Sequence, residues 1–209
     1  MLKQVVVGDD PDSKGVRLGA EVMGRGGIVV YPTDTLYGLG VDPTRSVAVE
    51  RLCRLKQRQV GAGLPLIAAH LTQVEACLGS VPYLGRRLSE QFWPGPLTLV
   101  FTPSQTLVPG VCAVDGSVAV RVPRCAVACR LAELGGQPIT ATSANHAGIP
   151  PAATARGVAS QLTRQVDLVL AGVRRLSGVA STIVDVRGDA PVLIRKGAIS
   201  WDHVLQSLQ

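Results

Sequence analysis

Short aliphatic runs that alternate with segments of helical period constrain the fold of this 209-residue chain more than any other feature. The runs at 28–31, 97–101 and 118–122 are bounded by turn residues, which is typical of buried strands. Residues 13–24 and 83–92 have the spacing of amphipathic helices. Aromatic residues make up only 3% of the chain, so Val, Leu, Ile and Ala must build the core. Such a composition is typical of an α/β protein whose sheet is covered on both faces.

The remaining elements follow from the same patterns. We predict further strands at 5–7, 64–69, 138–140, 166–170, 182–186 and 192–194. We predict further helices near 73–78, at 127–134 and at 202–208. Two more are expected, one that begins after an N-cap at Ser46 and one that follows the loop at 146–151 and ends at about 162. Hairpin-like links alternate with helical crossovers, which favours one mixed parallel and antiparallel sheet. Because the sequence contains no repeat, low-complexity stretch or linker, we expect a single domain over residues 1–209.

Charge and cysteine content narrow the class of protein. The net charge of +6 favours polyanionic partners such as nucleotide phosphates or RNA. No apolar run approaches the roughly 18 residues that a membrane span needs, so we expect a cytoplasmic protein without membrane contact. The five cysteines are odd in number and form no C-x-x-C. We interpret them as reduced, small residues of the core, with no disulfide and no metal site.

Polar residues gather in four segments that follow predicted strands or helices. Residues 31–40 place two hydroxyls and a carboxylate between a proline and a Gly-x-Gly pair, which suits either a ligand or a turn joining two strands. Residues 56–58 carry Lys and Arg beyond the end of a helix. These cations either bind a polyphosphate or only offset the helix dipole at a solvated helix end. Residues 140–145 offer small side chains, hydroxyls and an amide, either for phosphate oxygens or as a turn with a helix cap. The fourth segment, 181–185, is followed by Arg195 at the end of a predicted strand. Arg195 is either a ligand for a phosphate or carboxylate or a surface ion-pair partner.

Arg121 stands out because it lies in the apolar strand predicted at 118–122. An arginine that faces a cavity among aliphatic neighbours is costly to leave unpaired, so we expect it to meet a small, fixed anion. The chain contains no P-loop motif, no dinucleotide-binding G-x-G-x-x-G and no recognisable catalytic triad. These residues can therefore bind a nucleotide and stabilise charge without a covalent nucleophile.

Six segments resemble those of the threonylcarbamoyl-AMP synthases, the YrdC-like or TsaC family. They are YPTDTLYGLG (31–40), LKQR (55–58) with GLPLIAA (63–69), FWPGPLTLVF (92–101), VAVRVP (118–123), TSAN (142–145), and STIVD (181–185) with IRKGAIS (194–200). They follow the family's order and spacing over most of the chain. The resemblance implies a twisted α/β domain with an open basic cavity, in the short single-domain form that lacks the extra domain of longer members.

The resemblance also implies roles for individual residues by matching position. Lys56 and Arg58 would be the catalytic pair that holds the ATP phosphates, and Arg121 would pair with the carboxylate of threonine. Further ATP contacts are implied for Ser117, Ser143, Asn145, Pro151 and Arg195, and threonine contacts for Thr35, Arg121, Ala141 and Ser181. Mg²⁺ would accompany ATP with no permanently bound metal, and Asp34 is a candidate for its outer shell.

The activity implied is ATP-dependent activation of L-threonine and bicarbonate as threonylcarbamoyl-adenylate, for threonylcarbamoyladenosine in tRNA. Weak tRNA binding and a downstream threonylcarbamoyl-transferase partner are implied as well. The sequence departs from the family at Gln59, at Ala62 and at Val173 after Gly172, so the loop at 59–63 is the least secure assignment. Three alternatives remain: a non-catalytic protein that binds double-stranded RNA or tRNA, a carbamoyl-transfer enzyme with another acceptor, and an inactive paralogue.

Overall fold

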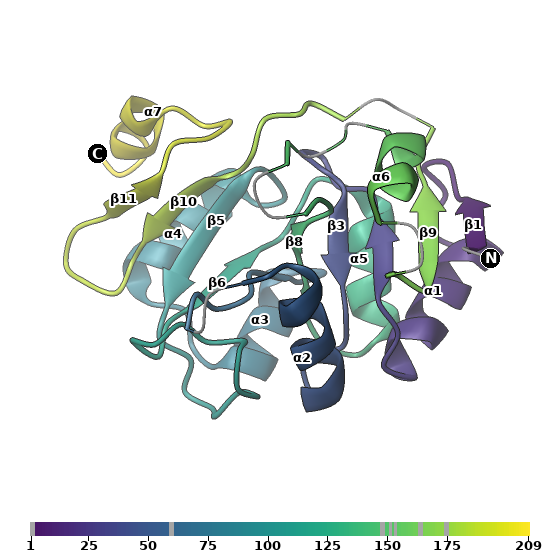
Figure 1. Ribbon diagram of the computed structural model, residues 1–209. Helices are drawn as coiled ribbons and strands as arrows, with labels where there is room; N and C mark the ends of the chain where they lie inside the picture. Colours follow the sequence, from purple (N-terminus) through teal and green to yellow (C-terminus); the bar gives the residue numbers. More distant parts are fainter. Residues whose placement is uncertain are drawn as a thin grey trace.

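Two mixed β-sheets and seven helices make up the described part of the protein in a computed structural model (Figure 1). The structure describes residues 3–58, 61–146, 149–150, 152, 154–162, 165–173 and 176–209. Within these ranges, no helix has the length and apolar character needed to cross a membrane. The predicted α/β class and mixed strand directions are confirmed, but the strands form two sheets where we expected one.

The first sheet has five strands. Their order across the sheet is β1 (Lys3–Val6), β9 (Leu168–Ala171), β2 (Val29–Tyr31), β3 (Gly38–Gly40) and β8 (Thr142–Ser143). β1, β9 and β2 run parallel, whereas β3 is antiparallel to both β2 and β8. The polar segment after β2 therefore lies at the carboxyl edge of parallel strands, where α/β proteins commonly bind ligands.

The second sheet has six strands. Their order is β11 (Val192–Arg195), β10 (Thr182–Asp185), β5 (Leu97–Phe101), β6 (Val118–Arg121), β4 (Leu66–Ile67) and β7 (Ile139–Thr140). β5 is buried at every residue, in agreement with its continuous apolar pattern. Only Ala141 separates β7 of this sheet from β8 of the other, so the chain crosses between the sheets at this point.

Seven helices pack around the sheets. They are α1 (Lys14–Gly24), α2 (Ser46–Leu55), α3 (Leu71–Leu78), α4 (Tyr83–Phe92), α5 (Ala126–Leu134), α6 (Ala155–Leu162) and α7 (Trp201–Gln206). In Figure 1, α1 and α6 lie beside the first sheet, and α4 and α7 beside the second, whereas α5 packs against α1 and against β4 of the second sheet. Apolar side chains of both sheets and of these helices build two buried clusters, which together form the core.

Three local predictions need correction. Ser46 does not cap α2: it is the first helical residue, the N-cap is Arg45, and no side chain caps this end. The strand predicted at 64–69 is reduced to Leu66 and Ile67. The five cysteines are free but only half-buried, so they lie beside the core rather than inside it.

Candidate functional site

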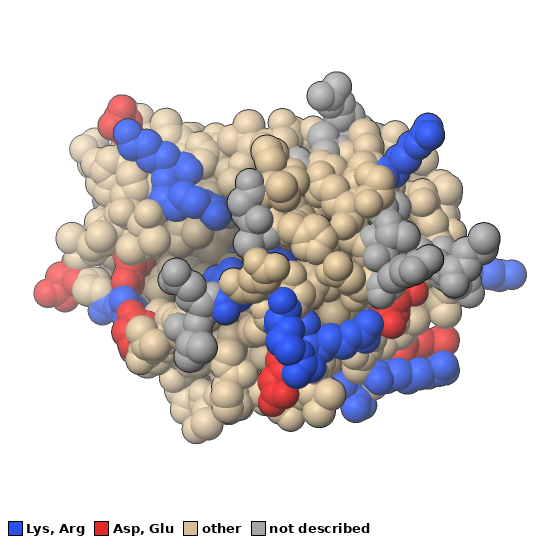
Figure 2. Space-filling view, viewed as in Figure 1, with Lys and Arg blue, Asp and Glu red and all other residues tan. Residues whose placement is uncertain are grey.

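A cavity of about 400 Å³ opens between strands of the two sheets, and we call it the central cavity. Seven of the predicted site residues line it: Thr35, Arg58, Arg121, Ala141, Ser143, Ser181 and Arg195. They come from segments spread over most of the chain, so the fold itself assembles the site. In Figure 2, lysine and arginine side chains lie above and within a hollow on this face of the molecule.

The segment after β2 forms a turn that also presents hydroxyls to the central cavity. The Thr33 hydroxyl donates to the Leu36 carbonyl at 2.6 Å and accepts from the backbone N–H groups of Thr35 and Leu36 at 3.1 and 3.2 Å. Its oxygen lies 3.0 Å from the Thr35 hydroxyl oxygen. Thr33 and Thr35 both line the cavity, so the turn and the ligand interpretation of this segment are compatible.

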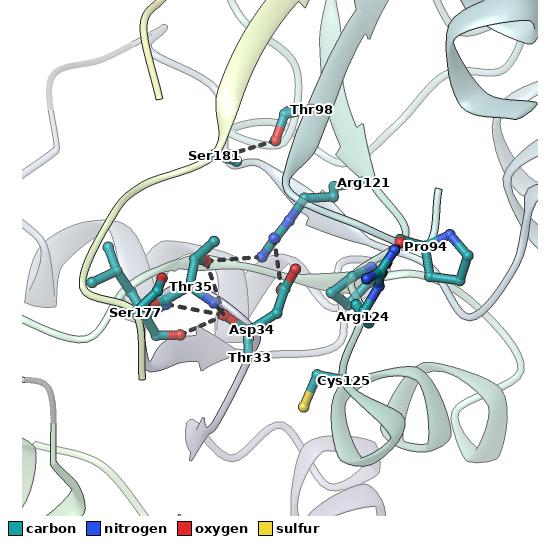
Figure 3. Close-up of polar contacts among 12 residues, drawn as sticks. Thr33, Asp34, Thr35, Pro94, Thr98, Arg121, Arg124, Cys125, Ser177 and Ser181 are labelled. Atoms are coloured by element: carbon teal, nitrogen blue, oxygen red, sulfur yellow. Dashed lines mark hydrogen bonds and ion pairs between the residues drawn. The ribbon is translucent and has the colours of Figure 1, made fainter. Parts of the chain in front are cut away.

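Arg121 meets its fixed anion within the chain. Its Nη1 lies 2.8 Å from Oδ1 of Asp34, and its Nη2 donates to the Thr35 hydroxyl at 3.3 Å (Figure 3). The side chains of Arg121 and Asp34 are only 8% and 14% exposed. Asp34 thus neutralises and orients the guanidinium that the sequence assigns to the threonine carboxylate. This partnership joins residues far apart in the chain, and the sequence alone did not reveal it.

Ser181 connects the central cavity to β11. Its hydroxyl lies 2.8 Å from that of Thr98, and its carbonyl accepts from Arg195 Nη2 at 2.8 Å. Gly197 allows this close approach, because a Cβ there would lie 2.3 Å from the carbonyl carbon of Ser181. Burial and the nearby Arg121 lower the pKa of Arg195, so an anionic ligand would offset the electrostatic cost of this cation.

Lys56 lies beneath the loop after β8. Its ammonium group donates to the Ser143 carbonyl at 2.8 Å and to the carbonyl and side-chain oxygens of Asn145 at 2.6 and 2.9 Å. Burial, and then Arg58, lower the pKa of Lys56 to about 8. Three acceptors occupy the three ammonium hydrogens, so Lys56 holds this loop in place rather than facing the central cavity.

Arg58 borders two cavities. Besides the central cavity it lines a neighbouring cavity of about 280 Å³, the side cavity, whose walls are largely apolar and include Ser117. Its Nη2 donates to the Ala62 carbonyl at 2.9 Å, whereas its buried Nε has no hydrogen-bond partner in the described part of the chain. A buried guanidinium nitrogen without a partner is suited to an anionic oxygen.

The donor set of the central cavity does not form a metal cage. Among the described residues, no group of three or more His, Cys, Asp or Glu is placed to hold a metal ion. The carboxylate of Asp34 is already paired with Arg121. The residues that line the cavity offer hydroxyls and guanidinium groups to a ligand.

The structure brings most predicted residues together, with four exceptions, the first of which is Lys56, bound to the 143–145 loop. Asn145 is buried against Lys56 and Ser143 and supports the cavity wall. Ser117 lies in the side cavity, and Pro151 falls outside the described residues, as does Gln59. Thr98 was missed, because a threonine in an apolar strand shows its role only once its partner across the sheet is known.

Comparison with known proteins agrees with this arrangement. Residues 21–197 match the Sua5/YciO/YrdC family, described as "Telomere recombination". Threonylcarbamoyl-AMP synthase of Pyrococcus abyssi is 33% identical over 189 residues, which cover 90% of this chain and 56% of the relative. The Nitrosococcus oceani enzyme of the same name is 36% identical, covering 82% of this chain and 93% of its own. The chain thus spans about half the length of the first of these relatives and most of the second.

A solved structure shows the same fold. The crystal structure of P. abyssi Sua5 complexed with L-threonine superposes with a TM-score of 0.87 at 31% identity, covering 100% of this chain and 61% of that one. The family match covers most of the sequence, and the fold matches that of a solved member. The chain therefore belongs to the Sua5/YciO/YrdC family.

Proposed function

We propose that this protein uses ATP and bicarbonate to activate L-threonine, forming threonylcarbamoyl-AMP and pyrophosphate. One observation carries the proposal: a single cavity joins Arg121, Thr35 and Ser181 to the cations Arg58 and Arg195. The first group suits the carboxylate and hydroxyl of an amino acid, and the second suits a polyphosphate. The names of the curated relatives, and the threonine in the P. abyssi structure, support the choice of substrate.

The chemistry needs positioning and charge stabilisation more than a reactive side chain. The threonine amine combines with CO₂ supplied by bicarbonate to give a carbamate. A carbamate oxygen attacks the α-phosphorus of ATP, the bond to the bridging oxygen breaks, and pyrophosphate leaves. Arg58 and Arg195 would stabilise the charge that develops on the phosphates, while Arg121 would hold the threonine carboxylate. ATP enters as its Mg²⁺ complex.

Other predicted residues would act through the loop and the side cavity. Lys56 would serve by fixing the backbone of Ser143 and Asn145, where Ser143 meets the nucleotide. The apolar side cavity beyond Arg58 would accept the less polar part of the nucleotide near Ser117. Ala141 would contribute backbone contacts to threonine at the crossing between the sheets. Pro151 stays a sequence-based prediction.

A binding experiment separates the two halves of the site. Arg58→Ala should weaken ATP binding at least about tenfold and change threonine binding less than about twofold, because a charge-assisted contact to phosphate is lost. Arg121→Lys should weaken threonine binding at least about tenfold and change ATP binding less than about twofold. A lysine keeps its charge beside Asp34 but cannot form a bidentate contact with a carboxylate. Calorimetric titration of both ligands into both variants measures this. Equal losses of both ligands in each variant would contradict the assignment.

The product is chemically labile, so we expect a partner that transfers the threonylcarbamoyl group to adenosine in tRNA. We also expect weak tRNA binding through exposed cations, among them Arg54 and Lys196. Counterion release drives such contacts, so the affinity should fall as the salt concentration rises. Filter binding at two salt concentrations tests this, and an affinity that does not change with salt would refute it.

A further inference from the structure

Residues 102–117 connect β5 to β6 as a long loop that contributes no strand to either sheet. Loops of this length in a compact domain usually carry a function. The last part of the loop, residues 111–117, forms walls of the side cavity through Val111, Ala113, Asp115 and Ser117. The position of this segment therefore determines the shape of the proposed nucleotide site.

The loop segment 111–117 is bound backbone to backbone to residues 61–64. Val114 N–H donates to the Gly61 carbonyl at 2.9 Å, and Leu64 N–H donates to the Val111 carbonyl at 3.0 Å. Gly63 has a φ of +59°, and a Cβ on it would lie 2.8 Å from the Ala113 nitrogen. The two segments pack so closely that a displacement of one must displace the other.

This paired unit supports two of the predicted nucleotide residues. Arg58 donates to the carbonyl of Ala62, within the first segment. The Ser117 backbone N–H and hydroxyl donate to Oδ1 of Asp115 at 3.0 and 2.7 Å, within the second. The carboxylate of Asp115 thus closes the turn before β6 by accepting both hydrogen bonds.

Arg187 ties the unit to the end of β10. Its Nη1 lies 2.8 Å from Oδ2 of Asp115, and its Nη2 lies 2.6 Å from Oδ2 of Asp185. Hydrogen bonds from Ser117, followed by the one from Arg187, lower the pKa of Asp115 to about 2, so this carboxylate stays ionised at neutral pH. Without the guanidinium between them, two carboxylates would repel each other and push the turn away from β10.

We propose that Arg187 is a positioning residue for the nucleotide half of the site. It acts through Asp115 on segments 111–117 and 61–64, and through them on Ser117 and Arg58. The inference rests on the proposed function, because it assumes that the side cavity and Arg58 receive ATP. Arg187 also lines the side cavity, but its ion pairs go to Asp115 and Asp185, so we assign it the role of holding the turn and no contact with either substrate.

The chain offers a closely matched control. Arg130 also joins two carboxylates, those of Asp12 and Glu133, at 3.0 and 2.8 Å, and its side chain is 34% exposed against 33% for Arg187. It lies on α5 and lines neither the central nor the side cavity. Arg130→Met therefore removes the same kind of ion pair without touching the proposed site.

The experiment compares the full-length chain with Arg187→Met, Arg187→Lys and Arg130→Met. We expect Arg187→Met to raise the Kd for ATP about five- to tenfold and to change that for threonine less than about twofold. Amide hydrogen exchange at Val114 and Leu64 should become faster in the same variant. Arg187→Lys should restore part of the ATP affinity, and Arg130→Met should leave all of these quantities as in the parent.

Three outcomes would overturn the inference. One is an unchanged ATP affinity in Arg187→Met, and another is an equal loss of threonine affinity, which would indicate general destabilisation. The third is unchanged exchange at Val114 and Leu64, which would show that Arg187 does not hold the loop. If the parent chain itself binds no ATP, the proposed function is wrong. Faster amide exchange in Arg187→Met would still show in that case that Arg187 holds the loop.

Discussion

Asp34→Ala should lower the free energy of unfolding by about 3 kcal/mol, the low end of the range for breaking a buried ion pair. Among the described residues, the substitution leaves the Thr35 hydroxyl as the one partner of the Arg121 guanidinium, in a site where the arginine side chain is 8% exposed. We take the low end because Arg121 borders the central cavity, from which water can reach it. Urea unfolding at neutral pH measures the change.

The control for this prediction is Asp12→Ala. Asp12 also pairs with an arginine, Arg130, but its side chain is 65% exposed. Exposed ion pairs contribute about 0–1 kcal/mol, so the control should lose little. Asp34→Asn keeps the volume and one acceptor oxygen, so its loss in the free energy of unfolding should lie between those of Asp34→Ala and Asp12→Ala. Equal losses in Asp34→Ala and Asp12→Ala would show that the buried pair does not stabilise the fold.

The regular elements with strong patterns could be predicted from the sequence. The helix at Tyr83–Phe92 and the strand at Leu97–Phe101 were predicted to the residue, because an amphipathic period and a continuous apolar run mark them clearly. β3 and β8 were missed. Gly38–Gly40 and Thr142–Ser143 have neither alternation nor a run of β-branched residues, and they are strands only because β2 lies beside β3.

The division into two sheets also lay beyond the sequence. Strand patterns show which residues are extended but not which strands are neighbours. Here the change from one sheet to the other occurs within five residues, between Ile139 and Ser143. Nothing in the composition of that segment marks the crossing.

The candidate site divides in a similar way. The residue types and the family resemblance located the segments, and seven of the predicted residues meet in the central cavity. The partners of these residues could not be predicted, because they depend on contacts across the fold. The two members of each pair are more than eighty residues apart in the sequence. The pairs are Asp34 with Arg121, Thr98 with Ser181, and the 143–145 loop with Lys56.

The largest effect that we expect in solution is the dependence of pyrophosphate release on threonine. With ATP, Mg²⁺ and bicarbonate present, threonine should turn release on, and removing either threonine or bicarbonate should abolish it. The reason is chemical: without the carbamate no nucleophile reaches the α-phosphorus, because the central cavity supplies hydroxyls and guanidinium groups rather than an activated side chain.

The same reaction tests most directly whether the central cavity joins threonine to the adenylate. The measurement follows pyrophosphate and the adenine nucleotides together, with Arg58→Ala as the impaired control. We predict one pyrophosphate for each AMP retained in a threonine-containing product, and a strongly reduced rate in the variant. Release of ADP and phosphate, or pyrophosphate formation that does not need threonine, would contradict it.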